Sequence, residues 1–131
     1  MGVRYLLDTH VMLWLLGQPE RVPARVREVL ADPAVDLLVS AVSAMEIATK
    51  TRLGKLPDVG LVQAWPRRLD DMGAVEVPLT GQHAITAGSM SWPHRDPFDR
   101  LLASVAIHEG ATLVSVDAAF ADLPAPTLLS W

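Results

Sequence analysis

Cysteine is absent from the 131 residues, which excludes disulfide bridges, thiolate zinc sites and thiol catalysis. Long hydrophobic runs are absent too, since no apolar stretch approaches the ~20 residues that a membrane-spanning helix needs. Asp8 and His10 interrupt the first apolar stretch too early for a signal peptide. These absences predict a cytoplasmic protein that does not associate with a membrane.

An excess of basic residues is also lacking. The chain has 11 Lys and Arg against 15 Asp and Glu, a net charge of −4. Proteins that bind nucleic acid over a broad surface are usually basic, so any such contact here must be local or assisted by a metal ion. Half of the residues are hydrophobic and the mean hydropathy is +0.27. Length and composition predict a single domain over residues 1–131.

Short apolar runs alternate with segments of helical spacing. The expected strands are 3–7, 36–39, 75–77, 112–116 and 127–129. The expected helices are 11–16, 23–31, 42–53, 61–72, 83–89 and 97–109. Near-continuous apolar strands that alternate with helices indicate an α/β protein. We expect a central, mostly parallel sheet of four to five strands with helices on both faces.

Four carboxylates lie at or near the points where expected strands give way to helices: Asp8, Glu46, Asp99 and Asp117. The carboxyl ends of parallel strands meet at one edge of a sheet, so these acids would gather there. Their mutual repulsion would raise some of their pKa values unless a cation binds. Oxygen ligands that leave room for water select Mg²⁺ or Mn²⁺ over zinc or copper. Such an ion suits phosphodiester hydrolysis, because it lowers the pKa of a bound water and offsets charge on the phosphate.

Each acid also has an ordinary structural interpretation. Asp8, Asp96 and Asp117 stand where aspartate often caps a helix N-terminus. Glu46 closes a capping-box pattern that begins at Ser43. Taken singly, each acid of the set is explained by capping as well as by catalysis, and only the four together point to a metal site.

Four short motifs resemble those of a known family, in the family's order. They are residues 7–14 (LDTHVMLW), 40–48 (SAVSAMEIA), 94–103 (HRDPFDRLLA) and 113–120 (LVSVDAAF). Together they resemble the PIN domains, in particular the VapC-type toxins of type II toxin–antitoxin systems. The resemblance covers essentially the whole chain and implies a PIN-like three-layer fold and a Mg²⁺- or Mn²⁺-dependent endoribonuclease. It also implies an RNA substrate, a small VapB-like antitoxin as partner, and a homodimer.

The resemblance also assigns roles to residues by their place in the motifs. Asp8 and Asp99 carry over as the principal metal ligands. Glu46 and Asp117 carry over as the other two acids, which would bind through water or a second ion, or orient the attacking water. Asp99 is preferred over Asp96 because the apolar helix of the family follows it. Asp96 is interpreted as an N-cap, and the alternative is that it supports the metal ligands without binding the ion.

Other side chains near the motifs are candidates for substrate contacts or for support of the acids. Thr9 supplies a hydroxyl beside the first acid, and Ser115 stands where many relatives have threonine. Arg95 and Arg100 could contact phosphate or pair with Asp96 or another acid. Two histidines, His10 and His94, adjoin the motifs, but they lack metal-binding spacing and are not predicted to be ligands.

Basic and apolar residues elsewhere allow two interpretations each. Lys50, Arg52 and Lys55 could steer RNA, or they could simply complement the C-terminus of the helix that carries Glu46. Residues 11–16 are apolar almost all round and include Trp14. That helix is either buried in the core or covered by a partner.

Two other functions compete with the ribonuclease. A PIN-like module without catalysis could bind RNA or protein, but the intact set of acids disfavours it. A metal-dependent phosphatase of another α/β family is disfavoured because dehalogenase-like enzymes need a second aspartate where His10 stands. Receiver-type phosphate acceptors need a distal lysine, and no lysine follows Lys55. Glycine signatures for nucleotide binding are also absent.

Overall fold

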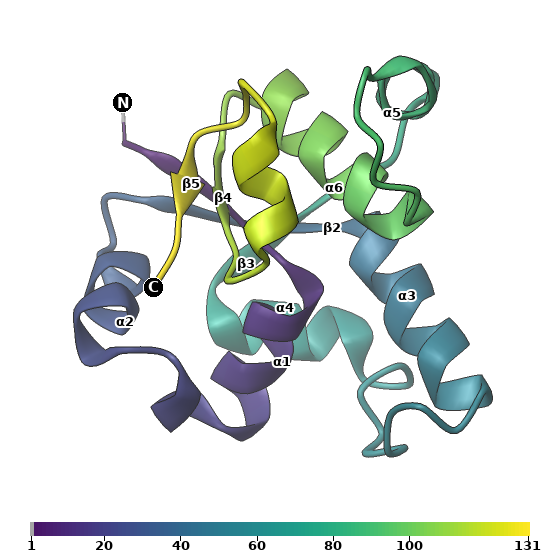
Figure 1. Cartoon of the computed structure of the whole chain (residues 1–131). Coiled ribbons are helices and arrows are strands. Elements are labelled where there is room, and N and C mark those ends of the chain that lie inside the picture. Colours follow the sequence, from purple (N-terminus) through teal and green to yellow (C-terminus); the bar gives the residue numbers. More distant parts are fainter. Residues whose placement is uncertain (1) are drawn as a thin grey trace.

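The computed structural model describes residues 2–131, and a five-stranded sheet forms its centre (Figure 1). The strand order is β3-β2-β1-β4-β5, and every neighbouring pair is parallel. The strands are β1 Arg4–Leu7, β2 Asp36–Ser40, β3 Ala74–Val77, β4 Thr112–Val114 and β5 Leu128–Leu129. The predicted α/β fold is confirmed, and its sheet is wholly parallel.

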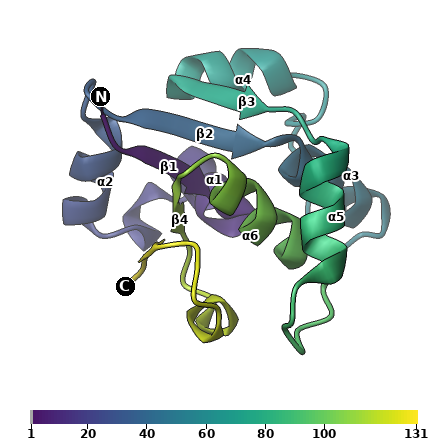
Figure 2. The ribbon, with the colours of Figure 1, turned by 90° about the horizontal axis from the view of Figure 1, so that it is seen from above.

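Helices connect the strands and cover both faces of the sheet (Figure 2). They are α1 Thr9–Gly17, α2 Ala24–Ala31, α3 Ala41–Arg52, α4 Trp65–Met72, α5 Gly81–Ser89 and α6 Pro97–His108, with the short 3-10 helices η1 Pro19–Arg21 and η2 Ala118–Asp122. None of the helices within residues 2–131 is both long enough and apolar enough to cross a membrane.

The hydrophobic core consists of two clusters, one on each face of the sheet, because neighbouring side chains of a strand point to opposite faces. Leu7 packs in one cluster with side chains of α1, α2 and α4, whereas its neighbour Leu6 packs in a second cluster with α6 and η2. The same alternation separates Leu37 from Leu38 in β2. Because successive side chains of a strand point to opposite faces, continuous apolar strands require cover on both faces.

Two predictions about helix starts were wrong. The helix expected over 61–72 begins at Trp65, because Pro66 fits only the first turn, where its missing N–H is not needed. The capping box expected from Ser43 to Glu46 does not form. Ser40 is the N-cap of α3 and accepts from the Val42 amide at 3.1 Å, so Ser43 and Glu46 lie further along the helix.

The order in which the chain adds strands to the sheet reverses between β1 and β4. From β1 the chain moves to β2 and β3 on one side, then returns to form β4 and β5 on the other. Ligands of open parallel sheets bind at the carboxyl ends of the strands beside such a point. Asp8 follows β1 directly, and Ser115 follows β4 directly, so both lie there.

Candidate metal centre

Asp8 stands at the N-cap position of α1, but its side chain does not cap the helix. Instead, the Ser115 hydroxyl donates a 2.6 Å hydrogen bond to Oδ2 of Asp8. Ser115 Oγ in turn accepts from the Asp117 amide at 3.1 Å. Asp8 is only 6% exposed, and burial raises the pKa of its carboxyl group, against the lowering effect of the Ser115 hydrogen bond. The capping interpretation of Asp8 is therefore wrong, since its carboxylate is held in the site.

Asp99 lies in the first turn of α6, three residues after the N-cap Asp96. Asp96 accepts from the amides of Phe98 at 2.9 Å and Asp99 at 3.4 Å, which confirms its predicted role as a cap. Burial raises the pKa of Asp99 to about 6. A hydrogen bond with His94 lowers that pKa, while the charges of Asp96, Asp8 and Asp117 raise it.

Asp117 caps η2 by accepting from the Ala119 amide at 3.0 Å, and its side chain is exposed. Its carboxylate nevertheless faces two other ligating groups. One potential ligand atom each from His94, Asp99 and Asp117 lies within 4.8 Å of the others. Asp117 therefore caps η2, and its place in this cluster leaves it available as a metal ligand as well.

Glu46 extends from α3 into the interior and is 3% exposed. Its Oε2 is paired with the ammonium group of Lys50, one turn along the helix. Its Oε1 is buried without a hydrogen-bond partner among residues 2–131. An unpaired carboxylate oxygen in the interior costs free energy, and a bound cation or water would remove that cost.

The four predicted acids influence one another's charge. Glu46 raises the pKa of Asp8, and Asp8 and Asp117 both raise the pKa of Asp99. Like charges brought together in this way favour the binding of a divalent cation. Apart from the imidazole of His94, the possible donors are carboxylate oxygens, which suit Mg²⁺ or Mn²⁺. The orphaned Oε1 of Glu46 and the oxygen-rich donor set therefore fit such an ion.

Thr9 and the two arginines lie around these acids in different ways. Thr9 is buried and its Oγ1 is 2.8 Å from Oγ of Ser43, which ties the start of α1 to α3. Arg95 is exposed and forms no ion pair within the described part of the chain. It remains a candidate for a phosphate contact.

Arg100 has a structural role that the sequence did not suggest. Its guanidinium donates to the backbone carbonyls of Ala87, Met90, Trp92 and His94 at 2.7–3.0 Å. All three of its nitrogen atoms are engaged in this way, and no acid of residues 2–131 pairs with it. The geometry thus contradicts the acidic pair within residues 2–131, while a phosphate contact of Arg100 stays an untested prediction.

His94 is the residue of this centre that the sequence analysis missed. Its Nε2 is 2.6 Å from Oδ2 of Asp99, and it belongs to the cluster with Asp117. A single histidine without characteristic spacing gives no metal-binding signal. The only available signal was its place five residues before Asp99 in the third motif.

Comparison with known proteins identifies the family. The model of the PIN domain matches residues 5–126. The chain belongs to the PIN domain family. A relative of this PIN domain is Ribonuclease VapC22 of Mycobacterium tuberculosis, which is 32% identical over 114 residues. That match covers 86% of this chain and 85% of the relative.

Solved structures share the same PIN fold. VapBC2 of Rickettsia felis, bound to a DNA fragment from its promoter, matches with a TM-score of 0.73 and 20% identity over 98% of this chain and 99% of that one. DNA-bound VapBC of Salmonella typhimurium matches with a TM-score of 0.69 and 18% identity over 98% of both chains. At these identities the likeness establishes the three-layer fold of this PIN domain.

Proposed function

We propose that this PIN domain is a metal-dependent endoribonuclease and the toxin of a toxin–antitoxin pair. The observation that carries the proposal is the buried, unpaired Oε1 of Glu46 within a set of mutually repelling carboxylates. The relative named Ribonuclease VapC22 and the VapBC complexes of the same fold support the same function. The protein would act in the cytoplasm on RNA, with Mg²⁺ or Mn²⁺ as cofactor.

The four acids would have different roles in catalysis, because their burial and their hydrogen-bond partners differ. Asp8 and Asp99 would hold the ion, with Asp117 completing the exposed side of the centre. When bound, the ion would lower the pKa of a water and offset charge on the scissile phosphate. The free Oε1 of Glu46 can accept a hydrogen bond from the attacking water and orient it. Arg95 is exposed, and its guanidinium could bind a phosphate oxygen of the RNA.

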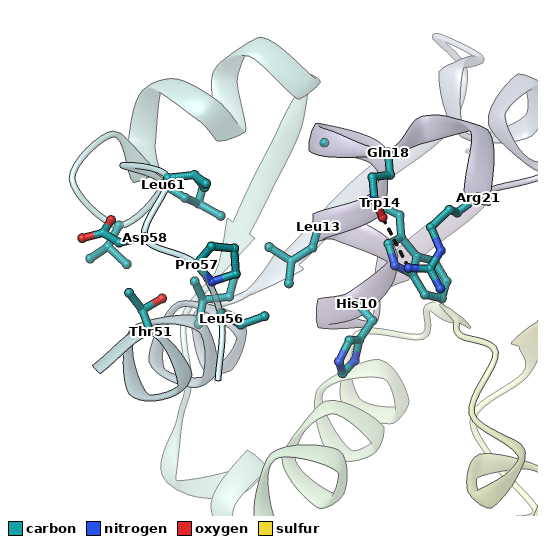
Figure 3. A pocket seen from close by; sticks show the side chains of 14 residues that line it. His10, Leu13, Trp14, Gln18, Arg21, Thr51, Leu56, Pro57, Asp58 and Leu61 are labelled. Carbon is teal, nitrogen blue, oxygen red and sulfur yellow. Dashed lines mark hydrogen bonds between the residues drawn. The ribbon is translucent and has the colours of Figure 1, made fainter. Parts of the chain in front are cut away.

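A groove beside α1 supports an antitoxin as partner (Figure 3). It has a volume of about 470 Å³ and lies between α1 and the loop that follows α3. Leu13, Trp14 and Leu56 give it an apolar lining, and Arg21 stacks over the Trp14 ring at 4.5 Å. Leu13 and Trp14 belong to the helix for which the sequence left open a covering partner. A VapB-like segment would fit there, and a second copy of the chain would form the expected homodimer elsewhere.

Cleavage of RNA by the purified, antitoxin-free protein tests the proposed activity. We expect cleavage with Mg²⁺ or Mn²⁺, none with EDTA, and loss of cleavage in Asp8→Asn and Asp99→Asn. Asp122→Asn is a matched control, because Asp122 is an exposed acid outside the centre. Equal cleavage by all of these variants would refute the assignment. Metal-dependent RNA binding without any cleavage would instead favour the catalytically silent module.

A further inference from the structure

We infer that His94 is a positioning residue of the metal centre, which holds Asp99 so that one carboxylate oxygen stays directed at the ion. The inference rests on the proposed function, since it concerns the metal centre proposed there. It adds a side chain to the set of acids and assigns a purpose to the irregular segment before α6.

His94 and Asp99 are joined by a short hydrogen bond in which the imidazole is the donor. His94 Nε2 lies 2.6 Å from Oδ2 of Asp99. An ionised carboxylate only accepts hydrogen bonds, so Nε2 carries the proton and donates it. Both side chains are partly shielded from water, at 30% exposure for His94 and 15% for Asp99. With Oδ2 engaged, Oδ1 is the oxygen of Asp99 that remains for an ion.

The imidazole ring of His94 packs against a buried pair of aromatic rings, Trp92 and Phe120, of which Trp92 contacts it directly. The rings of Trp92 and His94 lie with centroids 4.7 Å apart. Trp92 is buried, and its ring lies 5.7 Å from that of the fully buried Phe120 of η2. Asp117 caps that same short helix. The stack therefore connects His94 to the element that carries another acid of the centre.

The backbone of the segment is held by the helix that bears Asp99. Residues 90–96 have no regular secondary structure. Arg100, the neighbour of Asp99 on α6, donates to the carbonyls of Met90, Trp92 and His94. One helix thus fixes both partners of the His94–Asp99 bond. Fixing a segment without regular structure costs conformational entropy, and three charge-assisted hydrogen bonds offset that cost.

The same contact favours support of a ligand over direct ligation through Nε2. His94 Nε2 could bind an ion only after it lost its proton and the bond to Asp99. Hydrogen-bond partners of ligating carboxylates orient them, and their loss usually costs about 10- to 100-fold in metal affinity. This is the size of effect that we expect from removing the imidazole.

Calorimetric titration of Mn²⁺ into the full, antitoxin-free chain tests the inference. We expect His94→Ala to weaken Mn²⁺ binding by about 10- to 100-fold, as removal of such a partner does elsewhere. His94→Gln should retain much of the affinity, because its amide can donate to Asp99. His108→Ala is the matched control, since His108 lies at the other end of α6 and bonds to Thr86.

A spectroscopic measurement on the unmodified protein separates positioning from ligation. Pulsed electron paramagnetic resonance of bound Mn²⁺ should show no coupling to a directly ligated ¹⁴N. Such a coupling, unchanged affinity in His94→Ala, or equal losses in the Ala and Gln variants would each overturn the inference. The proposed metal centre fails separately if the unmodified chain does not bind Mn²⁺, or if Asp8→Asn and Asp99→Asn bind it normally.

Discussion

Ser115 donates a 2.6 Å hydrogen bond to Asp8, although 107 residues separate the two in sequence. Both side chains are buried, and they meet where β1 and β4 pair at the centre of the sheet. The bond therefore joins the first acid to the final third of the chain. It also orients the Asp8 carboxylate through Oδ2 and leaves Oδ1 without a contact to Ser115.

Removal of the Ser115 hydroxyl is predicted to destabilise the metal-free protein. In Ser115→Ala, Oδ2 of Asp8 loses its donor, and an unsatisfied buried acceptor costs about 1–3 kcal/mol. Urea denaturation would measure this loss. Ser115→Thr should lose less stability, because the hydroxyl is retained. Equal losses in the two variants would show that packing, and not the hydrogen bond, accounts for the effect.

Lys50 is predicted to stabilise the protein more when no metal is bound. Lys50→Met leaves the buried carboxylate of Glu46 without a partner on either oxygen. Since Lys50 is 27% exposed, we expect a loss of about 1–3 kcal/mol, below the value for a fully buried pair. Arg52→Met, on the exposed end of α3, is the control.

Added Mn²⁺ should restore part of the stability that Lys50→Met loses, because the ion supplies a second cation to the acids. Urea denaturation with and without Mn²⁺ would measure the recovery. If the variant and the unmodified protein gain equally from the ion, the ammonium group and the metal do not share Glu46.

The stability of the metal-free protein should depend on the ionisation of Asp99. The pKa of Asp99 is about 6 in the folded protein against 3.8 for the unfolded chain, so the folded state binds more protons between these values. The stability that Asp99 contributes is thus fully present below about pH 4 and is lost as the pH rises through about 6. Asp99→Asn should gain on the order of 2 kcal/mol over the unmodified protein at pH 8.

Urea denaturation with EDTA between pH 4 and pH 8 would reveal this difference. Asp122→Asn serves as the control for a change of net charge. The raised pKa of Asp8 should produce a shift of the same sign in Asp8→Asn. Parallel pH profiles for the unmodified protein and Asp99→Asn would contradict the prediction.

The two arginines of the third motif are predicted to behave oppositely. Arg100→Lys removes the planar group that reaches four carbonyls, and we expect a loss of about 2–4 kcal/mol in stability with less cleavage. Arg95→Ala should leave the melting temperature unchanged and raise the KM for RNA. Thermal denaturation and steady-state cleavage would test both variants. A destabilised Arg95→Ala, or an Arg100→Lys that changes only KM, would reverse the assignment.

The sequence predicted well the features that depend on hydrophobic periodicity and on local capping preferences, namely the strands of the sheet and the N-cap of α6. The apolar runs in β1, β2 and β4 identified the centre of a parallel sheet. Of the four acids expected at its carboxyl edge, Asp99 and Asp117 share a cluster with His94, and the joint use of all four as one metal site stays a prediction. Asp96 was correctly interpreted as the cap of α6, because an aspartate before proline has a strong local preference for that position.

Long-range contacts of single side chains escaped prediction. Arg100 bonds to carbonyls of an irregular loop, and the conformation of that loop has no periodic signature. The cap of α3 was misplaced by three residues, because Ser40 and Ser43 both suit an N-cap locally. Ser43 instead meets Thr9 of another helix, a contact that local spacing does not encode. His94 was missed for the same reason.

The central position of β1 also bears on when the protein becomes active during its synthesis. Asp8 emerges from the ribosome well before Ser115 and Asp117, which follow it by more than a hundred residues. A growing chain therefore lacks the complete set of acids until β4 has been released and has paired with β1. For a ribonuclease that needs all four acids, this order of assembly would delay activity until the last of these acids has been made.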